Sequence, residues 1–174
     1  DTLTAGDEVN YSCIKANVSS KAAITLTAMA SKSTSTAHQL CANDGVGSSG
    51  GVSYASGLTR YEALSGVLDG TITSEALTQV TMRTTNVLKN LFVYTSAYSL
   101  NVAATVAVRV NGSTTAISVS VSATGIVEDT SNSVTLVATD EANFIVDTTA
   151  AASGSFLPRL ISIEETQPAL NIGG

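Results

Sequence analysis

Apolar and polar residues alternate along most of the chain between residues 87 and 164. Short alternating runs occupy 87–94, 103–110, 114–122, 134–138, 143–147 and 157–164, and polar turn residues separate them. Successive side chains of a strand point to opposite faces, so alternating runs with turns every eight to twelve residues or so predict an antiparallel sandwich or barrel. No run of ten or more residues shows the 3.6-residue period of a helix, and the pattern therefore predicts an all-β fold.

One hairpin in this region has a strong turn signal. Asn111-Gly112 suits the positive φ angles of a type I′ turn, and apolar residues alternate on both sides of it. A two-residue turn predicts three cross-strand pairs that point both apolar faces the same way: Val106 with Ile117, Ala104 with Val119, and Val102 with Val121. The predicted core residues of this hairpin are Val106, Val108, Ile117 and Val119.

The first third of the chain has a different character. Residues 22–30 alternate like a strand, 31–36 are polar, and 43–51 are rich in Gly, as in a flexible loop. Residues 73–85 fit a strand better than a helical turn beginning at Ser74, because several Thr residues disfavour helix. We therefore predict an extended or loop-rich arm with a Gly-rich loop at 1–51, whose packing on the same domain stays open, and a β-sandwich at 52–174.

The end of the chain, from Glu165, is predicted to be an extended tail that Pro168 interrupts. Leu170 and Ile172 are the apolar residues of this tail. Apolar side chains on an extended segment need cover, and a neighbouring protein can supply it. We therefore predict that Leu170 and Ile172 anchor the tail on a partner.

Charge narrows the function classes. The net charge is −6, and the eight Lys and Arg residues are spread singly along the chain, so no basic stripe is available for nucleic acid. No stretch approaches the roughly 20 apolar residues that cross a membrane as a helix. Ser and Thr number 47, which predicts a surface rich in hydroxyl groups, as is common where a protein faces other protein copies or glycans.

Cysteine usage leaves two alternatives. Cys13 and Cys41 are the only cysteines, and their spacing fits no zinc pattern, even with His38 three residues before Cys41. Two unpaired thiols are favoured, and a disulfide that ties down the N-terminal region is the alternative.

Residues for catalysis are sparse. His38 is the only His, no Gly-x-Ser-x-Gly motif is present, and the Gly-rich loop lacks the Lys of a phosphate-binding loop. Four pairs of carboxylates are sequence neighbours, which point apart on a strand or turn and do not face each other across a cleft: Asp7-Glu8, Glu128-Asp129, Asp140-Glu141 and Glu164-Glu165. We predict no enzymatic activity, no catalytic residues, no cofactor and no metal. A calcium site at Asp129, Asn132 and Asp140 is a minor alternative.

Aromatic residues suggest one further surface. Phe92 and Phe144 are predicted to lie in the core, because both sit in alternating runs. Tyr94 and Tyr98 are predicted to form a surface patch beside the hairpin. Such a patch would be a weak indication of sugar binding.

Several of these segments together carry a resemblance. They are Leu88-Lys-Asn-Leu-Phe-Val, Thr105-Val-Ala-Val-Arg-Val-Asn-Gly, Ile117-Ser-Val-Ser-Val, Val134-Thr-Leu-Val-Ala-Thr-Asp, Phe144-Ile-Val and Leu160-Ile-Ser-Ile-Glu. The run from Val87 to Glu164 resembles the C-terminal part of small jelly-roll domains in phage virion proteins. The chain departs from the pattern at Thr139-Asp140-Glu141, where relatives often have Gly-Asp.

The resemblance implies a jelly-roll sandwich without catalytic residues. Such domains occur in cement (decoration) proteins that clamp capsid shells and in the heads of tail fibres, both typically homotrimers. The expected partners are further copies of this chain and the major capsid protein, and the expected location is the capsid surface of a virion assembled in the host cytoplasm. The alternatives are a carbohydrate-binding fibre head and a fimbrial-type extracellular subunit, which shares the Ala/Thr/Ser/Val-rich composition and a Cys pair of similar spacing.

Overall fold

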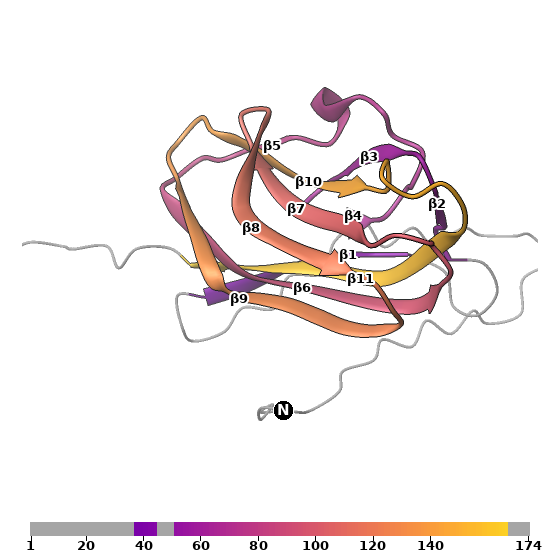
Figure 1. The fold of residues 1–174 in the computed structure, drawn as a ribbon. Helices are drawn as coiled ribbons and strands as arrows, with labels where there is room; N and C mark the ends of the chain where they lie inside the picture. Colours follow the sequence, from indigo (N-terminus) through magenta and orange to yellow (C-terminus); the bar gives the residue numbers. More distant parts are fainter. Residues whose placement is uncertain (1–36, 45–50, 167–174) are drawn as a thin grey trace, which may run out of the picture.

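The computed structural model describes residues 37–44 and 51–166, and it shows two β-sheets stacked face to face (Figure 1). Sheet A has the order β4-β1-β11-β6-β9, and β2 also pairs with β11. Its strands are β1 (Ala37–Asn43), β2 (Tyr54–Ala55), β4 (Gly66–Val67), β6 (Asn86–Tyr98), β9 (Gly125–Leu136) and β11 (Ser155–Thr166). All neighbours in sheet A are antiparallel except the short β1–β4 pair.

Sheet B lies above sheet A in Figure 1 and has the order β3-β10-β7-β8, with β5 also paired with β10. Its strands are β3 (Thr59–Glu62), β5 (Val80–Thr81), β7 (Ala104–Val110), β8 (Ser113–Val121) and β10 (Glu141–Asp147), all antiparallel. The all-β prediction is therefore confirmed for the part of the chain that the structure describes.

The beginning of the described chain belongs to sheet A. β1 lies before the predicted boundary between residues 51 and 52, yet it is an internal strand between β4 and β11. At the other end, Glu165 and Thr166 pair with Leu88 and Val87 in β6, so β11 extends two residues into the predicted tail. The predicted strand at 22–30, Cys13, Leu170 and Ile172 lie outside the described residues.

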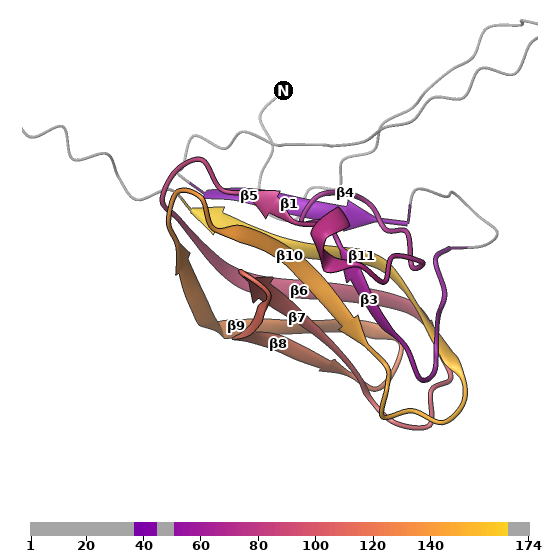
Figure 2. The same ribbon diagram turned by 90° about the horizontal axis from the view of Figure 1, so that it is seen from above.

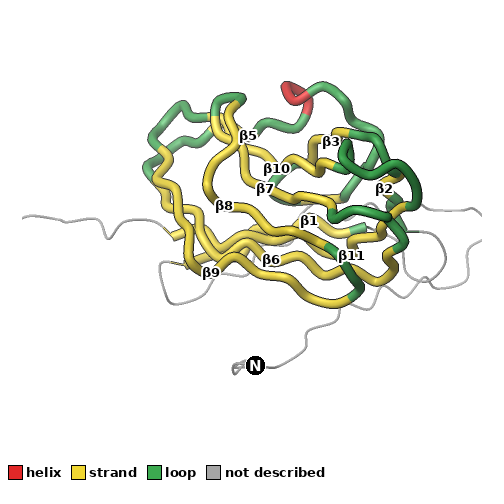
Figure 3. Tube along the Cα trace, in the orientation of Figure 1, coloured by secondary structure: helices red, strands yellow, loops and turns green. Residues whose placement is uncertain are grey.

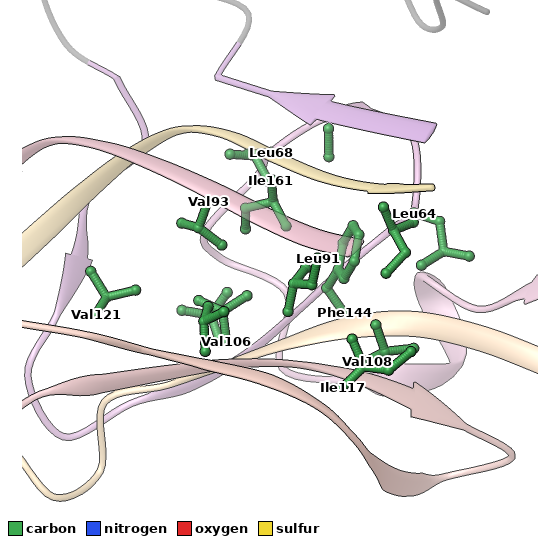
Figure 4. Close-up of a cluster of buried hydrophobic side chains, with 14 of the residues drawn as sticks. Leu64, Leu68, Leu91, Val93, Val106, Val108, Ile117, Val121, Phe144 and Ile161 are labelled. Atoms are coloured by element: carbon green, nitrogen blue, oxygen red, sulfur yellow. The ribbon is translucent and has the colours of Figure 1, made fainter. Parts of the chain in front are cut away.

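The core fills the space between the sheets (Figure 4). Phe144 from β10 and Ile161 from β11 lie there with Leu91 and Val93 from β6, all at 0% exposure. The predicted hairpin residues Val106, Val108 and Ile117 are also at 0% exposure, and Val119 is buried. Alternation thus puts one face of each sheet against the other, and Figure 2 shows the same stacking from above.

The hairpin between β7 and β8 has the predicted turn but not the predicted pairing. Asn111 (φ 49°) and Gly112 (φ 77°) form the turn, and Val110 pairs with Ser113. Three residues of β8, 115–117, then oppose the single residue Val108, where the Thr115 hydroxyl donates to the Val108 carbonyl (3.0 Å). This bulge shifts the register by two, so the predicted pairs were wrong: Val106 pairs with Val119, Ala104 pairs with Val121, and Val102 lies outside the strand. A shift of two leaves the faces unchanged.

Two other local predictions are corrected. Residues 75–77 form the 3₁₀ turn η1 (Glu75–Leu77) and not a strand, and only Val80 and Thr81 of 73–85 pair as a strand. Residues 128–133 belong to the polar stretch that was predicted to form a turn between the runs 114–122 and 134–138, but they lie inside β9, where 130–132 bulge opposite Asn90. The Asp129 carboxylate accepts the N–H groups of Ser131 and Asn132 (both 3.1 Å), so the turn chemistry is present inside a continuing strand.

Candidate functional site: the outer face of sheet A

The outer face of sheet A has a row of aligned residues that crosses all five strands of its main path, and four of the five are apolar. The register aligns one residue from each strand: Val67, Asn43, Leu160, Tyr94 and Ile126, in the order β4-β1-β11-β6-β9. Aligned residues on neighbouring strands share a face, so these side chains stand side by side. Val67 (45%), Tyr94 (41%) and Ile126 (60%) are among the most exposed large apolar residues described.

The adjacent row forms a shallow groove. Cys41, Ser162, Phe92 and Glu128 align across β1, β11, β6 and β9. Together with Gln39, Asn90 and Leu160 they line a hollow of about 360 Å³. Phe92 and Leu160 make its surface apolar, and the amides of Gln39 and Asn90 stand beside it. The hollow is therefore suited to contact with an apolar group that also has polar atoms at its edge.

A strand bulge explains why Phe92 lies on this face and not in the core as predicted. Strict alternation from Leu88 would put residues 88, 90 and 92 on one side. Asn90 instead has φ 55°, a left-handed conformation that Asn tolerates, and Leu88 and Leu91 both point into the core. The parity changes at Asn90, so Phe92 turns outward. The Leu-Lys-Asn-Leu sequence contains this signal, because an Asn between two leucines three apart is a candidate bulge.

Polar contacts fix the rim of the groove. The Gln39 amide donates to the Ser162 hydroxyl (2.8 Å), and the Asn90 amide donates to Glu164 (2.6 Å), which also pairs with Lys89 (3.2 Å). The Glu128 carboxylate makes no hydrogen bond or ion pair with any residue that the structure describes. Burial raises the pKa of the Cys41 thiol, so this thiol is neutral. The face can therefore bind by apolar contact and hydrogen bonding, with one unpaired carboxylate.

The other candidate residues are dispersed. Tyr98 does not join Tyr94 in a patch, because its ring packs on Phe156 (6.3 Å between ring centroids) and its hydroxyl donates to the Val102 carbonyl (2.9 Å). Within the described ranges, Cys41 forms no disulfide. The predicted alternatives for Cys13 and Cys41 stay predictions.

The three residues of the calcium alternative do not converge. Asp129 and Asn132 contact each other (3.0 Å), but the Asp140 carboxylate accepts the Asn111 amide instead (2.8 Å). Among residues 37–44 and 51–166, no three His, Cys, Asp or Glu side chains are grouped as metal ligands would be. Asp129 also accepts the Ser118 N–H (3.0 Å), and this contact joins β9 of sheet A to β8 of sheet B.

Sequence reasoning missed most of the apolar row. Val67, Leu160 and Ile126 come from three separate strands, and only the sheet order brings them together.

No helix in the described part of the chain has the length and apolar character needed to span a bilayer. Neither protein-family models nor curated proteins yielded a match to this chain.

Proposed function

We propose that this chain is a non-enzymatic structural subunit of a virion, a capsid cement protein that docks on neighbouring protein subunits through the outer face of sheet A. The observation that carries the proposal is the row of half-buried Leu160 with exposed Tyr94 and Ile126, which exposed Val67 continues beyond Asn43. Large apolar residues that stand side by side on an exposed face are typical of an interaction site.

The strand order supports a jelly roll. The eight longer strands pair in a nested series: β1 with β11, β3 with β10, β6 with β9, and β7 with β8. Nested pairing results when one long antiparallel hairpin is rolled so that its strands divide between two sheets, four to each sheet. This supports the resemblance of residues 87–164 to phage virion domains, and that resemblance points to a capsid surface as the location.

The character of the face fits a protein partner. A sheet face whose apolar and aromatic residues lie beside polar groups matches the anatomy of protein interfaces, where apolar and aromatic residues lie at the centre and polar residues at the rim. Further copies of this chain, as a homotrimer, and the major capsid protein are the partners we propose. A cement protein of this kind stabilises the shell by bridging neighbouring capsomers.

A charge on this face tests the proposal. We expect Ile126→Asp to abolish self-association, measured as mass by light scattering, and to reduce cosedimentation of the chain with virions by at least tenfold or so, since a hot-spot residue contributes about 2 kcal/mol or more. Leu77→Asp is the matched control, because Leu77 is 76% exposed and lies on η1, away from sheet A. Equal effects of the two variants, or none from Ile126→Asp, would contradict the proposal.

The tail is tested separately. Deleting residues 167–174, which removes Leu170 and Ile172 and leaves β11 intact, should weaken trimer or capsid binding if the tail anchors on a partner. Unchanged affinity would eliminate the tail as an anchor, while the proposal for sheet A would stand or fall with the Ile126 variant.

The Phe92 groove favours one second candidate, a carbohydrate-binding fibre head. An aromatic ring beside amide and carboxylate groups is a common way to hold a sugar, and Gln39, Asn90 and Glu128 surround Phe92. Glycan binding that Phe92→Ala abolishes, with virion association unchanged, would favour this candidate over the cement protein.

A further inference from the structure

The turn between β7 and β8 contains a reactive sequence. Asn111-Gly112 is the only Asn-Gly step in the chain, and both residues are exposed in the described structure. Glycine has no side chain to shield its own N–H, so the nitrogen of a Gly that follows Asn can reach the Asn carboxamide carbon when the local backbone is free to rotate. The sequence and the exposure of Asn111 together make its side chain a candidate for deamidation.

The fold holds the Asn111 side chain away from that reaction. Its amide donates to Asp140 Oδ1 (2.8 Å), and its oxygen accepts the Glu141 N–H (2.9 Å). The Asn111 backbone N–H also donates to the Glu141 carbonyl (2.8 Å). Both polar atoms of the carboxamide are therefore bound to the neighbouring turn between β9 and β10, and the group points toward that turn instead of toward the nitrogen of Gly112.

The receiving turn is itself well fixed. The other oxygen of Asp140 accepts the Val137 N–H (2.8 Å), and the Asp140 carbonyl accepts the Met82 N–H (2.7 Å). The N–H of Val137 and then the Asn111 amide lower the pKa of the Asp140 carboxyl, so this carboxylate is charged at neutral pH. Arg109 donates to the Gly112 carbonyl and steadies the first turn from the other side. We call Asn111, Asp140 and Glu141 the turn clamp.

We propose that Asn111 is a deamidation site that the turn clamp protects, so that its conversion records opening of this end of the sandwich. When the clamp opens, the Gly112 nitrogen gives up its proton and attacks Asn111 Cγ. A C–N bond forms, the Asn111 Cγ–Nδ2 bond breaks, and the side-chain NH2 takes up a proton and leaves as ammonia, which gives a five-membered succinimide. Water then hydrolyses either carbonyl of the ring, which leaves an aspartate or an isoaspartate at position 111. No oxidant or reductant is needed.

Conversion prevents the clamp from closing again. The product has a carboxylate where the amide donor was, directly opposite the Asp140 carboxylate. One hydrogen bond is lost and two like charges come within contact distance, which is unfavourable. An isoaspartate also adds a carbon to the backbone of the two-residue turn, which no longer fits the φ angles of 49° and 77°. The change is one-way, because the ammonia has left.

The test is a time course of deamidation followed by mass spectrometry of the peptide that contains residue 111. Comparing the folded chain with the chain in concentrated urea, we expect conversion to be at least tenfold or so slower when folded, because reaction requires local opening. In Asp140→Ala the folded chain should convert about fivefold faster than wild type, since a lost hydrogen bond raises the open population by roughly that factor.

A matched control variant distinguishes opening of the turn clamp from a general loss of stability of the sandwich. Asp147 ends the same strand, β10, and accepts the Thr149 N–H (2.8 Å) and hydroxyl (2.6 Å) at the opposite end of the sandwich. We expect Asp147→Ala to leave the rate at Asn111 unchanged. Equal rates in the folded and unfolded chains, or equal acceleration by the two variants, would overturn the proposal. As a second readout, Asn111→Asp should lose amide-exchange protection at Glu141, and retained protection would also overturn it.

Discussion

The two outer faces of the sandwich are built from the same alternating strands, but a described segment lies over part of sheet B and none lies over sheet A. On sheet B, the segment 71–79, which we call the strap, crosses the face, and its short helical turn is visible above the strands in Figure 3. Ala107, an outward residue of β7, is at 0% exposure there. On sheet A no described segment crosses the face, and Ile126, an outward residue of β9, is 60% exposed.

The chemical character of the outward residues differs between the two faces. Beneath the strap, polar side chains bond to it: Arg109 donates to both oxygens of Glu75 (2.6 and 3.0 Å), and the Asn143 amide donates to Thr78 (3.0 Å), whereas Asn143 Oδ1 has no partner among the described residues. Arg109 also lies over the Tyr61 ring (5.7 Å). A segment of the same chain can satisfy buried polar groups by specific bonds, whereas an apolar row needs a broad surface placed on it. The outward residues of one sandwich can therefore suit two different kinds of contact, with a segment of the same chain or with a partner protein.

Removing Arg109 should have the largest effect on this comparison. Arg109→Ala deletes both bonds to Glu75 and leaves that carboxylate without its partner, and the two side chains are only 15% and 18% exposed. We expect a loss of about 2 kcal/mol in the free energy of unfolding, less than for breaking a fully buried ion pair, because both side chains keep some exposure. Urea unfolding measures the loss, and amide exchange in residues 73–79 should show that the strap has detached.

Arg83→Ala is the control for this variant, because Arg83 is exposed and contacts no described residue through a hydrogen bond or ion pair. Its effect should stay within about 0.5 kcal/mol. If Arg109→Ala were equally mild, the strap would be held by its other bonds, from the Tyr61 N–H to the Ile72 carbonyl (3.1 Å) and from the Asn143 amide to Thr78 (3.0 Å), and not by the arginine.

Asp129 should have the next largest effect, because it joins the two sheets where β8 meets β9. Burial raises the pKa of this carboxyl, but the bonds from the Asn132 side chain and from the N–H groups of Ser118, Asn132 and Ser131 together lower it below the ordinary value. Asp129→Asn should cost about 1–2 kcal/mol at neutral pH, since backbone donors lose a charged acceptor.

The pH dependence follows from the direction of this shift. A lowered folded-state pKa contributes stability that is fully present above the unfolded value, about 3.9, and is lost as the pH falls through the folded value. The difference in unfolding free energy between wild type and Asp129→Asn should therefore be constant near neutral pH and shrink below about pH 4. A difference that persists undiminished into strong acid would show that the variant disturbs packing and not a charged contact.

Sequence alone predicted the sheets better than their registers. The Asn111-Gly112 turn is local chemistry and could be predicted, but the bulge at 115–117 depends on Thr115 reaching the carbonyl of Val108 on another strand. The polar residues 128–133 correctly indicate side-chain-to-backbone hydrogen bonds of the kind found in turns, which Asp129 makes with Ser131 and Asn132. It did not reveal that β6 continues to pair on both sides of the bulge, because pairing partners are set by the tertiary fold.

The candidate face was harder to predict for the same reason. The core prediction for Phe92 is wrong because it assumes strict alternation, whereas Asn90 has a positive φ and reverses the parity of β6. The alignment of Ile126 with Tyr94 depends on sheet order, which a single sequence does not encode in any local pattern. Local periodicity predicts which residues share a strand face, whereas a binding face is a property of strands that are distant in sequence.

The smallest effect on stability should come from the residue on which the proposed docking depends most. Ile126→Asp changes a side chain that is already 60% exposed, so we expect the free energy of unfolding to change by less than about 0.5 kcal/mol. Urea unfolding of the isolated chain at low concentration measures this. A loss of 2 kcal/mol or more there, of the size expected for a packed residue, would show that Ile126 is covered within the single chain, and sheet A would then resemble sheet B. Unchanged stability together with lost association would instead establish that the two faces differ in what covers them: the chain's own strap on one, and a partner on the other.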